Sequence, residues 1–331
     1  MRKALLIGVD HYVHLNHLTG CVNDAYGMKG ILERDADATV NFPTPKVLVG
    51  TSAARSVTKQ EIKQSVRDLF EDDAEIALFY FAGHGYAEET GGYLCGSDSQ
   101  TGDDGFSIRD LMVLASRSPA TNKIIIIDAC HSGVAGARAD APTTTEISEG
   151  TTVLTASTAN QSAYEVPGGG AGVFTNLLID ALEGAAANLV GDITPGSVYA
   201  HIDQSLGPWG GQRPVFKTNV KSFVSLRRAM PPIELHDLLA LSAHFPSDSH
   251  IFKLDPSFEP ERSAEDRANP KIPPPDPENV STFGVLQNYV KVNLVRPIGT
   301  RHMWHAAMQS TACELTVLGQ HYRRLVAQGL I

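Results

Sequence analysis

Two short apolar runs constrain the fold of this chain more than any other feature. One reads Phe-Tyr-Phe-Ala-Gly-His-Gly and contains His84, and the other reads Ile-Ile-Ile-Ile-Asp-Ala-Cys-His-Ser-Gly and contains Cys130, 46 residues later. Continuous β-branched and aromatic runs are typical of parallel strands that are buried on both faces. Each run stops at a reactive side chain close to glycine. The pattern predicts a buried sheet that presents a histidine and a cysteine at one edge.

Similar apolar runs alternate with helix-period stretches from residue 1 to about residue 228. We predict strands at Lys3–Val9, Lys46–Val49, Ile76–Phe81, Lys123–Asp128, Thr152–Ala156 and Pro214–Lys217. Between them the spacing predicts helices near Asn23–Glu33, Thr58–Glu71, Ile108–Arg117, Gly172–Ala187 and Gly196–Leu206, with a capping box at Thr58 and Glu61. The alternation indicates an α/β fold, with a mostly parallel six-stranded sheet and helices on both faces. Ligands bind at the carboxyl ends of such strands, where His84 and Cys130 would meet.

The composition changes after residue 228. Residues 231–277 hold ten of the nineteen prolines among acidic side chains, so we expect residues 229–283 to form an extended, acidic, Pro-rich linker. Residues 284–331 regain apolar spacing, which predicts a strand over Tyr289–Val295 and a helix over Leu315–Ile331. This tail holds five lysines and arginines against one acid. We expect a small α+β docking module here; binding of a partner protein or of nucleic acid is the alternative.

Charge and cysteine usage exclude several classes of partner and compartment. The formal net charge of -10 argues against nucleic acid or an anionic membrane as the main partner. The four cysteines are far apart and form no C-x-x-C, so neither a zinc site nor a disulfide framework is expected. Reduced thiols fit the cytoplasm. The first apolar run ends at Asp10, which is too short for a signal peptide or a membrane span.

A cysteine and a histidine presented together are suited to acyl transfer. The imidazole takes the thiol proton, because only the thiolate is a good nucleophile, and later protonates the leaving amine. Cys130 with His84 supplies this pair, and backbone amides near Gly85 and Cys130 could stabilise the oxyanion. The competing interpretation of these two residues is a buried core cysteine and an unrelated loop histidine.

The wider context favours the catalytic interpretation. The strings F-x-G-H-G and D-A-C-H-S-G resemble those of caspase-like cysteine peptidases, in the branch of metacaspases and bacterial caspase homologues. The resemblance extends over residues 1–228 and includes Gly20-Cys-Val-Asn-Asp-Ala and Gly172-Val-Phe-Thr. It implies a caspase-type sheet, His84 as the general base and Cys130 as the nucleophile. Asp128 stands where the caspase signature has Gln, a departure that metacaspases share.

The resemblance also implies a substrate preference. Caspases grip an aspartate with arginines, but this chain has no Lys or Arg between Ala4 and Met28. It has instead Asp24 and Asp128, which match the acids that line the primary pocket of metacaspases and bind arginine or lysine. We therefore expect cleavage of proteins after Arg or Lys. Ala82 departs from the serine that many metacaspases have in this pocket, and a helix-capping role is the alternative for Asp24.

Family members are commonly zymogens or are gated by partners. Residues 133–151 are small and polar, which predicts a flexible surface loop, and Arg138 within it is a candidate for activating cleavage. An upstream protease or a sensor protein is the partner implied. Resemblance to bacterial caspase homologues suggests a regulated role in antiviral defence or cell suicide.

No cofactor is required by this chemistry, although some metacaspases need calcium. Asp98, Asp103 and Asp104 are the candidate calcium ligands, while a solvated acidic loop is the favoured interpretation of these residues. Two other functions remain open. One is a non-catalytic caspase-like scaffold, and the other is a protease gated by nucleic acid bound to residues 284–331.

Overall fold

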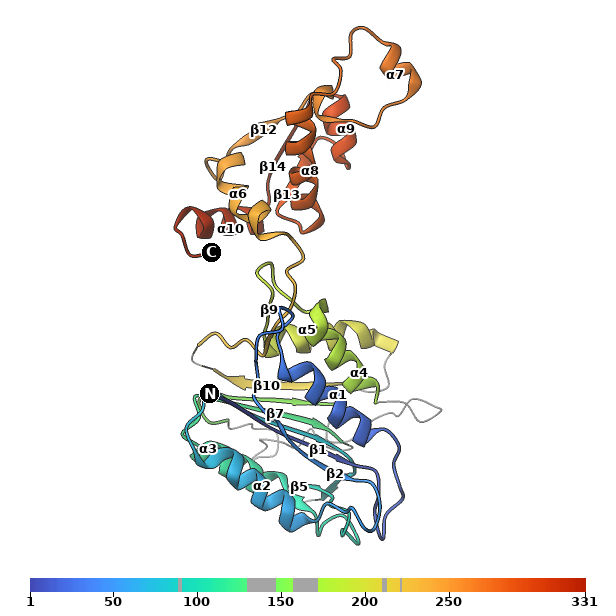
Figure 1. Ribbon diagram of the computed structural model, residues 1–331, viewed down its shortest axis with the longest axis vertical. Coiled ribbons are helices and arrows are strands. Elements are labelled where there is room, and N and C mark those ends of the chain that lie inside the picture. The colour runs from blue at the N-terminus through green and yellow to red at the C-terminus, as the bar shows by residue number, and fades with distance from the viewer. Residues whose placement is uncertain (89–90, 130–146, 157–171, 210–212, 221) are drawn as a thin grey trace. The chain divides into compact units, whose positions relative to one another are not determined.

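The computed structural model describes residues 1–88, 91–129, 147–156, 172–209, 213–220 and 222–331. These residues form two compact units (Figure 1). The first unit consists of Met1–Ala187 and Gly191–Met230, and the second of Asn188–Val190 and Pro231–Ile331. The first unit has hydrophobic clusters on both faces of its sheet, and the second has a cluster of its own.

The centre of the first unit is a six-stranded sheet with the strand order β10-β8-β7-β3-β1-β2. Its strands are β1 (Arg2–Val9), β2 (Lys46–Gly50), β3 (Ile76–Ala82), β7 (Asn122–Asp128), β8 (Thr151–Thr155) and β10 (Val215–Asn219). All neighbours are parallel except β10, which runs antiparallel to β8. The predicted α/β fold with a mostly parallel six-stranded sheet is therefore confirmed. Smaller antiparallel sheets are formed by β4 (Gly85–Glu88), β5 (Gly91–Leu94) and β6 (Phe106–Ser107), and by β9 (Asp192–Ile193) and β11 (Arg227–Arg228).

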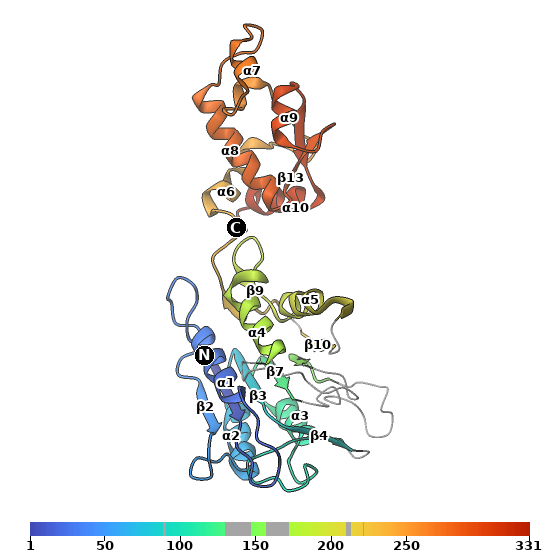
Figure 2. The same cartoon turned by 90° about the vertical axis from the view of Figure 1, so that its right-hand side faces the viewer.

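Helices cover both faces of the large sheet (Figures 1 and 2). One face carries α1 (Cys21–Glu33), α4 (Val173–Asp180), its π-helical continuation η2 (Ala181–Ala185) and α5 (Pro195–Leu206), followed by the 3-10 turn η3 (Gly207–Trp209). The other face carries α2 (Lys59–Glu71) and α3 (Ile108–Arg117). Both views show α1 beside α4. The starts of both helices lie at the carboxyl ends of central strands, since Gly8 of β1 closely approaches the carbonyl of Cys21 and Gly172 closely approaches Asp128 at the end of β7.

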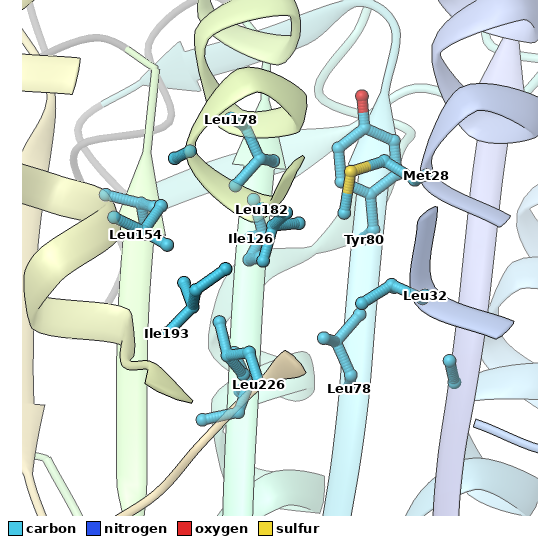
Figure 3. Packing of buried hydrophobic residues seen from close by; sticks show 14 of the residues in the cluster. Met28, Leu32, Leu78, Tyr80, Ile126, Leu154, Leu178, Leu182, Ile193 and Leu226 are labelled. Atoms are coloured by element: carbon cyan, nitrogen blue, oxygen red, sulfur yellow. The ribbon is translucent and has the colours of Figure 1, made fainter. Parts of the chain in front are cut away.

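Side chains of the central strands alternate between the two hydrophobic clusters. Along β3, Leu78 and Tyr80 belong to the cluster under α1 and α4, whereas Phe79 and Phe81 belong to the cluster under α2 and α3. Figure 3 shows Leu78, Tyr80 and Ile126 among residues of the first cluster. Every residue of β3 and β7 is buried, which explains why β3 is apolar throughout and why the centre of β7 is a run of isoleucines.

Local capping determines where α2 begins. The side chain of Thr58 accepts a hydrogen bond from the N–H of Glu61 at 3.3 Å, and Glu61 Oε2 accepts from the N–H of Thr58 at 2.8 Å. This reciprocal pair is the capping box that the spacing of these two residues predicts, and it satisfies two amides that a helix start leaves unpaired.

The second unit combines helices with a three-stranded antiparallel sheet in the order β12-β14-β13. Its elements are α6 (Leu235–His244), β12 (Ile251–Lys253), the 3-10 turn η4 (Pro256–Phe258), α7 (Ala264–Ala268), α8 (Pro277–Lys291), β13 (Val295–Ile298), α9 (Met303–Met308), β14 (Ala312–Leu315) and α10 (Val317–Ala327). In the parts of the chain that are described, no helix combines the length and apolar character needed to cross a bilayer.

This unit corrects the expected linker over 229–283. That stretch contributes α6, β12 and η4 to the unit, and its side chains Leu238, Leu241 and Phe258 are buried in the core. The prolines do not extend the chain. Pro277, for example, occupies the first turn of α8, where a backbone N–H would have no acceptor within the helix, so its absence costs nothing. Asp276 caps the same helix by accepting hydrogen bonds from the N–H groups of Glu278 and Asn279.

A buried arginine organises the remaining proline-rich loop. Arg262 is 9% exposed and donates hydrogen bonds to the carbonyls of Glu259, Pro273 and Pro256, at 2.9 and 2.5 Å for the first two. Prolines supply no backbone N–H, so carbonyls in a proline-rich loop have few backbone donors nearby, and one guanidinium with several donors pairs with three of them.

The expected strand over Tyr289–Val295 is also corrected. Tyr289 lies in the last turns of α8, fully buried, and its hydroxyl donates to the carbonyl of Asp237 at 2.5 Å. A strand begins only at Val295, after Asn293 reverses the chain with a positive φ of 59°. The alternation that predicts a strand here spans the end of a helix and its turn. The helix expected over Leu315–Ile331 is observed as α10.

Candidate active site

His84 follows the end of β3, beside the end of β7. The register of these strands pairs Ala82 with Asp128, and the N–H of Gly83 donates to the carbonyl of Asp128 at 3.3 Å. His84 is two residues beyond Ala82, and Cys130 is two residues beyond Asp128. Cys130 itself, like Arg138, lies outside the described residues. The described chain reaches Ala129, so the sheet brings His84 to the strand end that immediately precedes the cysteine.

A backbone carbonyl fixes the imidazole of His84. Its Nε2 lies 2.8 Å from the carbonyl oxygen of Asn16, in the loop between β1 and α1. A carbonyl oxygen only accepts hydrogen bonds, so Nε2 carries the proton in the neutral ring and Nδ1 is the basic nitrogen. This interaction leaves Nδ1 as the nitrogen that can accept a proton. The carbonyl of His84 in turn accepts from the N–H of Cys95 at 3.0 Å, which ties the residue to the chain after β5.

Tyr12 contacts the turn that carries the histidine. The hydroxyl of Tyr12 accepts the backbone N–H of His84 at 2.8 Å, and the two rings are 4.7 Å apart between centroids. Burial raises the pKa of Tyr12 well above its ordinary value, so the phenol stays neutral. A methyl group at Gly83 would lie 2.7 Å from this hydroxyl. Glycine is therefore required before the histidine, and Gly85, the expected oxyanion donor, follows it at the start of β4.

The two predicted acids converge at the start of α4. Asp24, on the first turn of α1, is 3% exposed, and Asp128, at the end of β7, is 8% exposed. A methyl group at Gly172 would lie 2.9 Å from Asp128 Oδ2 and 3.6 Å from Asp24 Oδ2. The N–H of Gly172 also donates to Asp24 Oδ2 at 3.3 Å. Three segments far apart in the sequence thus assemble one acidic site.

Two hydroxyls that sequence reasoning missed belong to this site. Thr175 donates to Asp128 Oδ2 at 2.7 Å, and the hydroxyl of Tyr80 lies 2.6 Å from the hydroxyl of Thr175. Both residues are fully buried. Thr175 belongs to the Gly-Val-Phe-Thr string that carries part of the family resemblance, so a signal for it was present. Tyr80 and the carbonyl of Asn16 gave no such signal.

The candidate calcium ligands lie elsewhere, in the loop between β5 and β6. Asp98 Oδ1 accepts from the N–H of Lys59 at 2.9 Å, and Asp104 accepts from the N–H groups of Gln100 and Gly102 at 2.7 and 3.1 Å. Asp103 accepts from the hydroxyl of Thr101. Among the residues described, no three His, Cys, Asp or Glu side chains are grouped as a metal would require. Asp103 and Asp104 thus accept hydrogen bonds within their own loop, and Asp98 accepts one from the start of α2.

Comparison with known proteins gives the family. Residues 1–224 match the family model of the peptidase C14 caspase domain. Metacaspase-6 of Arabidopsis thaliana is 33% identical over 153 residues, covering 40% of this chain and 38% of that protein. Metacaspase-4 of Arabidopsis thaliana is 32% identical over 152 residues, covering 40% of this chain and 34% of that protein. The match thus spans little more than a third of either relative.

A solved structure has the same fold. The crystal structure of Caspase-1 from Spodoptera frugiperda matches with a TM-score of 0.50 and 15% identity, covering 69% of this chain and 91% of that one. At this identity the similarity concerns the fold alone. The family model, by contrast, matches more than half of the sequence. This chain therefore belongs to the caspase family of cysteine peptidases.

Proposed function

We propose that this protein is a cysteine endopeptidase that cleaves proteins after Arg, and also after Lys, with Cys130 as nucleophile and His84 as general base. The observation that carries this proposal is the convergence of Asp24 and Asp128 beside Gly172, at the end of the strand that leads into Cys130. Two buried carboxylates beside the nucleophile would pair with a guanidinium or an ammonium group. They would repel the acidic side chain that caspases accept.

The catalytic cycle follows from the tautomer of His84. With Nε2–H held by the carbonyl of Asn16, Nδ1 takes the proton of the Cys130 thiol. The thiolate attacks the carbonyl carbon, and the N–H groups of Gly85 and Cys130 stabilise the oxyanion that forms. The C–N bond then breaks, and His84 gives its proton to the leaving amine. Water, deprotonated by the same nitrogen, hydrolyses the thioester and restores the thiol.

Peptide turnover tests the proposal directly. Fluorogenic peptides ending in Arg, Lys or Asp before the reporter should rank with Arg first and Asp undetectable. Cys130→Ala should abolish turnover. Cys313→Ala is the matched control, because Cys313 is a buried thiol of the second unit. Preferential cleavage after Asp, or turnover that survives in Cys130→Ala, would overturn the proposal, and no turnover of any peptide would favour a scaffold.

We further propose that activity is regulated by cleavage at Arg138. An enzyme that cuts after arginine would recognise this site in its own chain, so self-processing or an upstream protease of the same specificity could act there. Arg138→Gln should keep the chain intact and lower its activity, whereas Arg138→Lys should retain processing. Full activity of an uncut Arg138→Gln chain would contradict this mode of control.

The setting of this activity is proposed on sequence grounds. The cysteines show no paired spacing, which fits a reducing cytoplasm, and the resemblance to bacterial caspase homologues supports a role in defence or cell suicide. Expression of the wild-type chain and of Cys130→Ala in phage-challenged bacteria tests this role. Protection that requires Cys130 is expected, and equal protection by both chains would contradict it.

A further inference from the structure

Three polar side chains form a buried row that ends on one of the two acids. Tyr80 of β3, Thr175 of α4 and Asp128 of β7 are joined by contacts of 2.6 Å between the two hydroxyls and 2.7 Å between Thr175 and Asp128 Oδ2. The row runs across the same face of the sheet, because Tyr80 and Asp128 both occupy positions that point toward α1 and α4. Neither hydroxyl belongs to the proposed catalytic pair.

The direction of the hydrogen bonds in this row follows from the number of protons. A threonine hydroxyl has one proton, and Thr175 gives it to the carboxylate of Asp128. The Tyr80 hydroxyl must then be the donor to Thr175. Burial raises the pKa of Tyr80 well above its ordinary value, with the nearby charges of Asp128 and Asp24 adding to the effect, so this phenol keeps its proton.

Burial makes these contacts important for the carboxylate. Tyr80 and Thr175 have no exposed surface, and Asp128 is only 8% exposed. Taking a carboxylate out of water disfavours its charged form, and hydrogen bonds donated to the charged form oppose that effect. The bond from Thr175 becomes stronger when Tyr80 polarises it, because hydrogen bonds in a chain reinforce one another.

We propose that Thr175 and Tyr80 are positioning residues for substrate specificity, holding the Asp128 carboxylate in place to receive the basic side chain before the scissile bond. This inference rests on the proposed preference for arginine. Thr175 acts on Asp128 directly, and Tyr80 acts through Thr175. Binding of a substrate arginine therefore depends on Thr175 and Tyr80 through their effect on Asp128.

Substrates that differ only in charge test the inference. Citrulline has the shape of arginine without its charge, so the ratio of kcat/KM for Arg and citrulline peptides measures the contribution of the acidic site. Thr175→Val should lower this ratio about tenfold, mainly through KM for the Arg peptide, as expected for one lost hydrogen bond to a charged group. Tyr80→Phe should lower it less, and Thr175→Ser, which keeps the hydroxyl, should restore it.

A matched control separates this effect from a general loss of packing. Thr152 is also buried, and its hydroxyl pairs with that of Thr218 at 2.8 Å, near the opposite end of β8. Thr152→Val removes a buried threonine hydroxyl elsewhere in the sheet and should leave the ratio unchanged. An unchanged ratio in Thr175→Val, or an equal decrease in both variants, would overturn the inference.

A second measurement does not depend on turnover. In the Cys130→Ala protein with 13C-labelled aspartate, NMR titration should give a higher pKa for Asp128 when Thr175→Val is added, because the charged form loses a donor. The ionisable groups that act on Tyr80 are Asp128, Asp24 and Cys21, and the label follows the two carboxylates in the same titration. An unchanged Asp128 pKa would overturn the inference even if arginine is not the substrate. A wild-type enzyme that does not distinguish Arg from citrulline would overturn only the proposed preference.

Discussion

The hydroxyl of Tyr12 accepts the backbone N–H of His84 at 2.8 Å, so a side chain of the loop after β1 holds the turn that presents the candidate general base. The same loop provides the carbonyl of Asn16 for the imidazole. Tyr12 thus holds the backbone of His84, and Asn16, four residues later, holds its side chain. The position of Gly85, the next residue, depends on the same turn.

Removal of this hydroxyl should reduce catalysis. Tyr12→Phe leaves the His84 N–H without its acceptor, and an unsatisfied buried amide costs about 1–3 kcal/mol. We expect kcat for an Arg peptide to fall about tenfold or more, with a smaller change in KM, because the turn serves the reacting groups. Tyr93→Phe, which removes a hydroxyl bonded to Glu88 in the small sheet, is the control. Equal kcat in Tyr12→Phe and wild type would refute the role of this contact.

Substitution of Gly172 should weaken arginine recognition. In Gly172→Ala the added methyl group would lie 2.9 Å from Asp128 Oδ2, which forces the carboxylate or the start of α4 to move. We expect KM for the Arg peptide to rise about tenfold, the scale of one charge-assisted contact. Gly196→Ala is matched to it, because Gly196 also lies at a helix start and its nearest neighbouring atom is 3.9 Å from the added methyl. A normal KM in Gly172→Ala would place the arginine site elsewhere.

Thiol labelling should single out Cys130. Burial raises the pKa of Cys95 and of Cys313 to about 12, so both remain thiols at neutral pH. Limited iodoacetamide at pH 7 followed by peptide mass spectrometry should therefore find Cys130 modified first. His84→Ala should slow that reaction, since the imidazole that accepts the thiol proton is gone. Faster labelling of Cys95 or Cys313 would contradict this expectation.

The second unit should lose stability as the pH falls. Burial lowers the pKa of His244 below its unfolded value of 6.5, because the ring packs against Phe252 and Tyr289. The unfolded chain therefore binds a proton more readily below pH 6.5, and the folded unit is destabilised in that range. The stability that the second unit loses between pH 7.5 and pH 5.5 should be smaller in His244→Gln than in the parent protein. His321→Gln, which changes an exposed histidine, should not reduce that loss.

Fluorescence can follow this effect in the full chain. The two tryptophans lie in different units, Trp209 in the first and Trp304 in the second. In a Trp209→Phe background, Trp304 reports denaturant unfolding of the second unit at each pH. Identical pH dependence in His244→Gln and its parent would show that another group is responsible.

Calcium chelation should leave activity intact. The carboxylates of Asp98, Asp103 and Asp104 accept hydrogen bonds from their own loop or from Lys59, and among the described residues they are not grouped as ligands of one cation would be. We expect turnover of the Arg peptide to change less than twofold between millimolar EGTA and millimolar calcium. Activity that requires calcium and is lost in Asp98→Asn would restore these residues as ligands.

Local patterns were sufficient for most of the first unit. The run from Ile76 to Phe81 predicts a buried strand because both faces of that strand are covered, and Thr58 with Glu61 predicts the start of a helix because both groups act within one turn. Sequence patterns gave the wrong secondary structure in the second unit, where contacts between distant residues determine the conformation. Tyr289 is helical because its ring and hydroxyl are buried against α6, and the proline-rich stretch folds because Arg262 binds its carbonyls.

By itself, the sequence determined the α/β class and the two strand ends that precede His84 and Cys130, and its resemblance to metacaspases pointed to Asp24 and Asp128 as acids of the expected pocket. Only the tertiary structure decided that Asp24 and Asp128 meet at Gly172, that the carbonyl of Asn16 sets the tautomer of His84, and that Thr175 and Tyr80 support Asp128. The physical reason is that these contacts join segments far apart in the chain. Strand register and helix packing place such partners together, and a backbone carbonyl leaves no mark in the sequence.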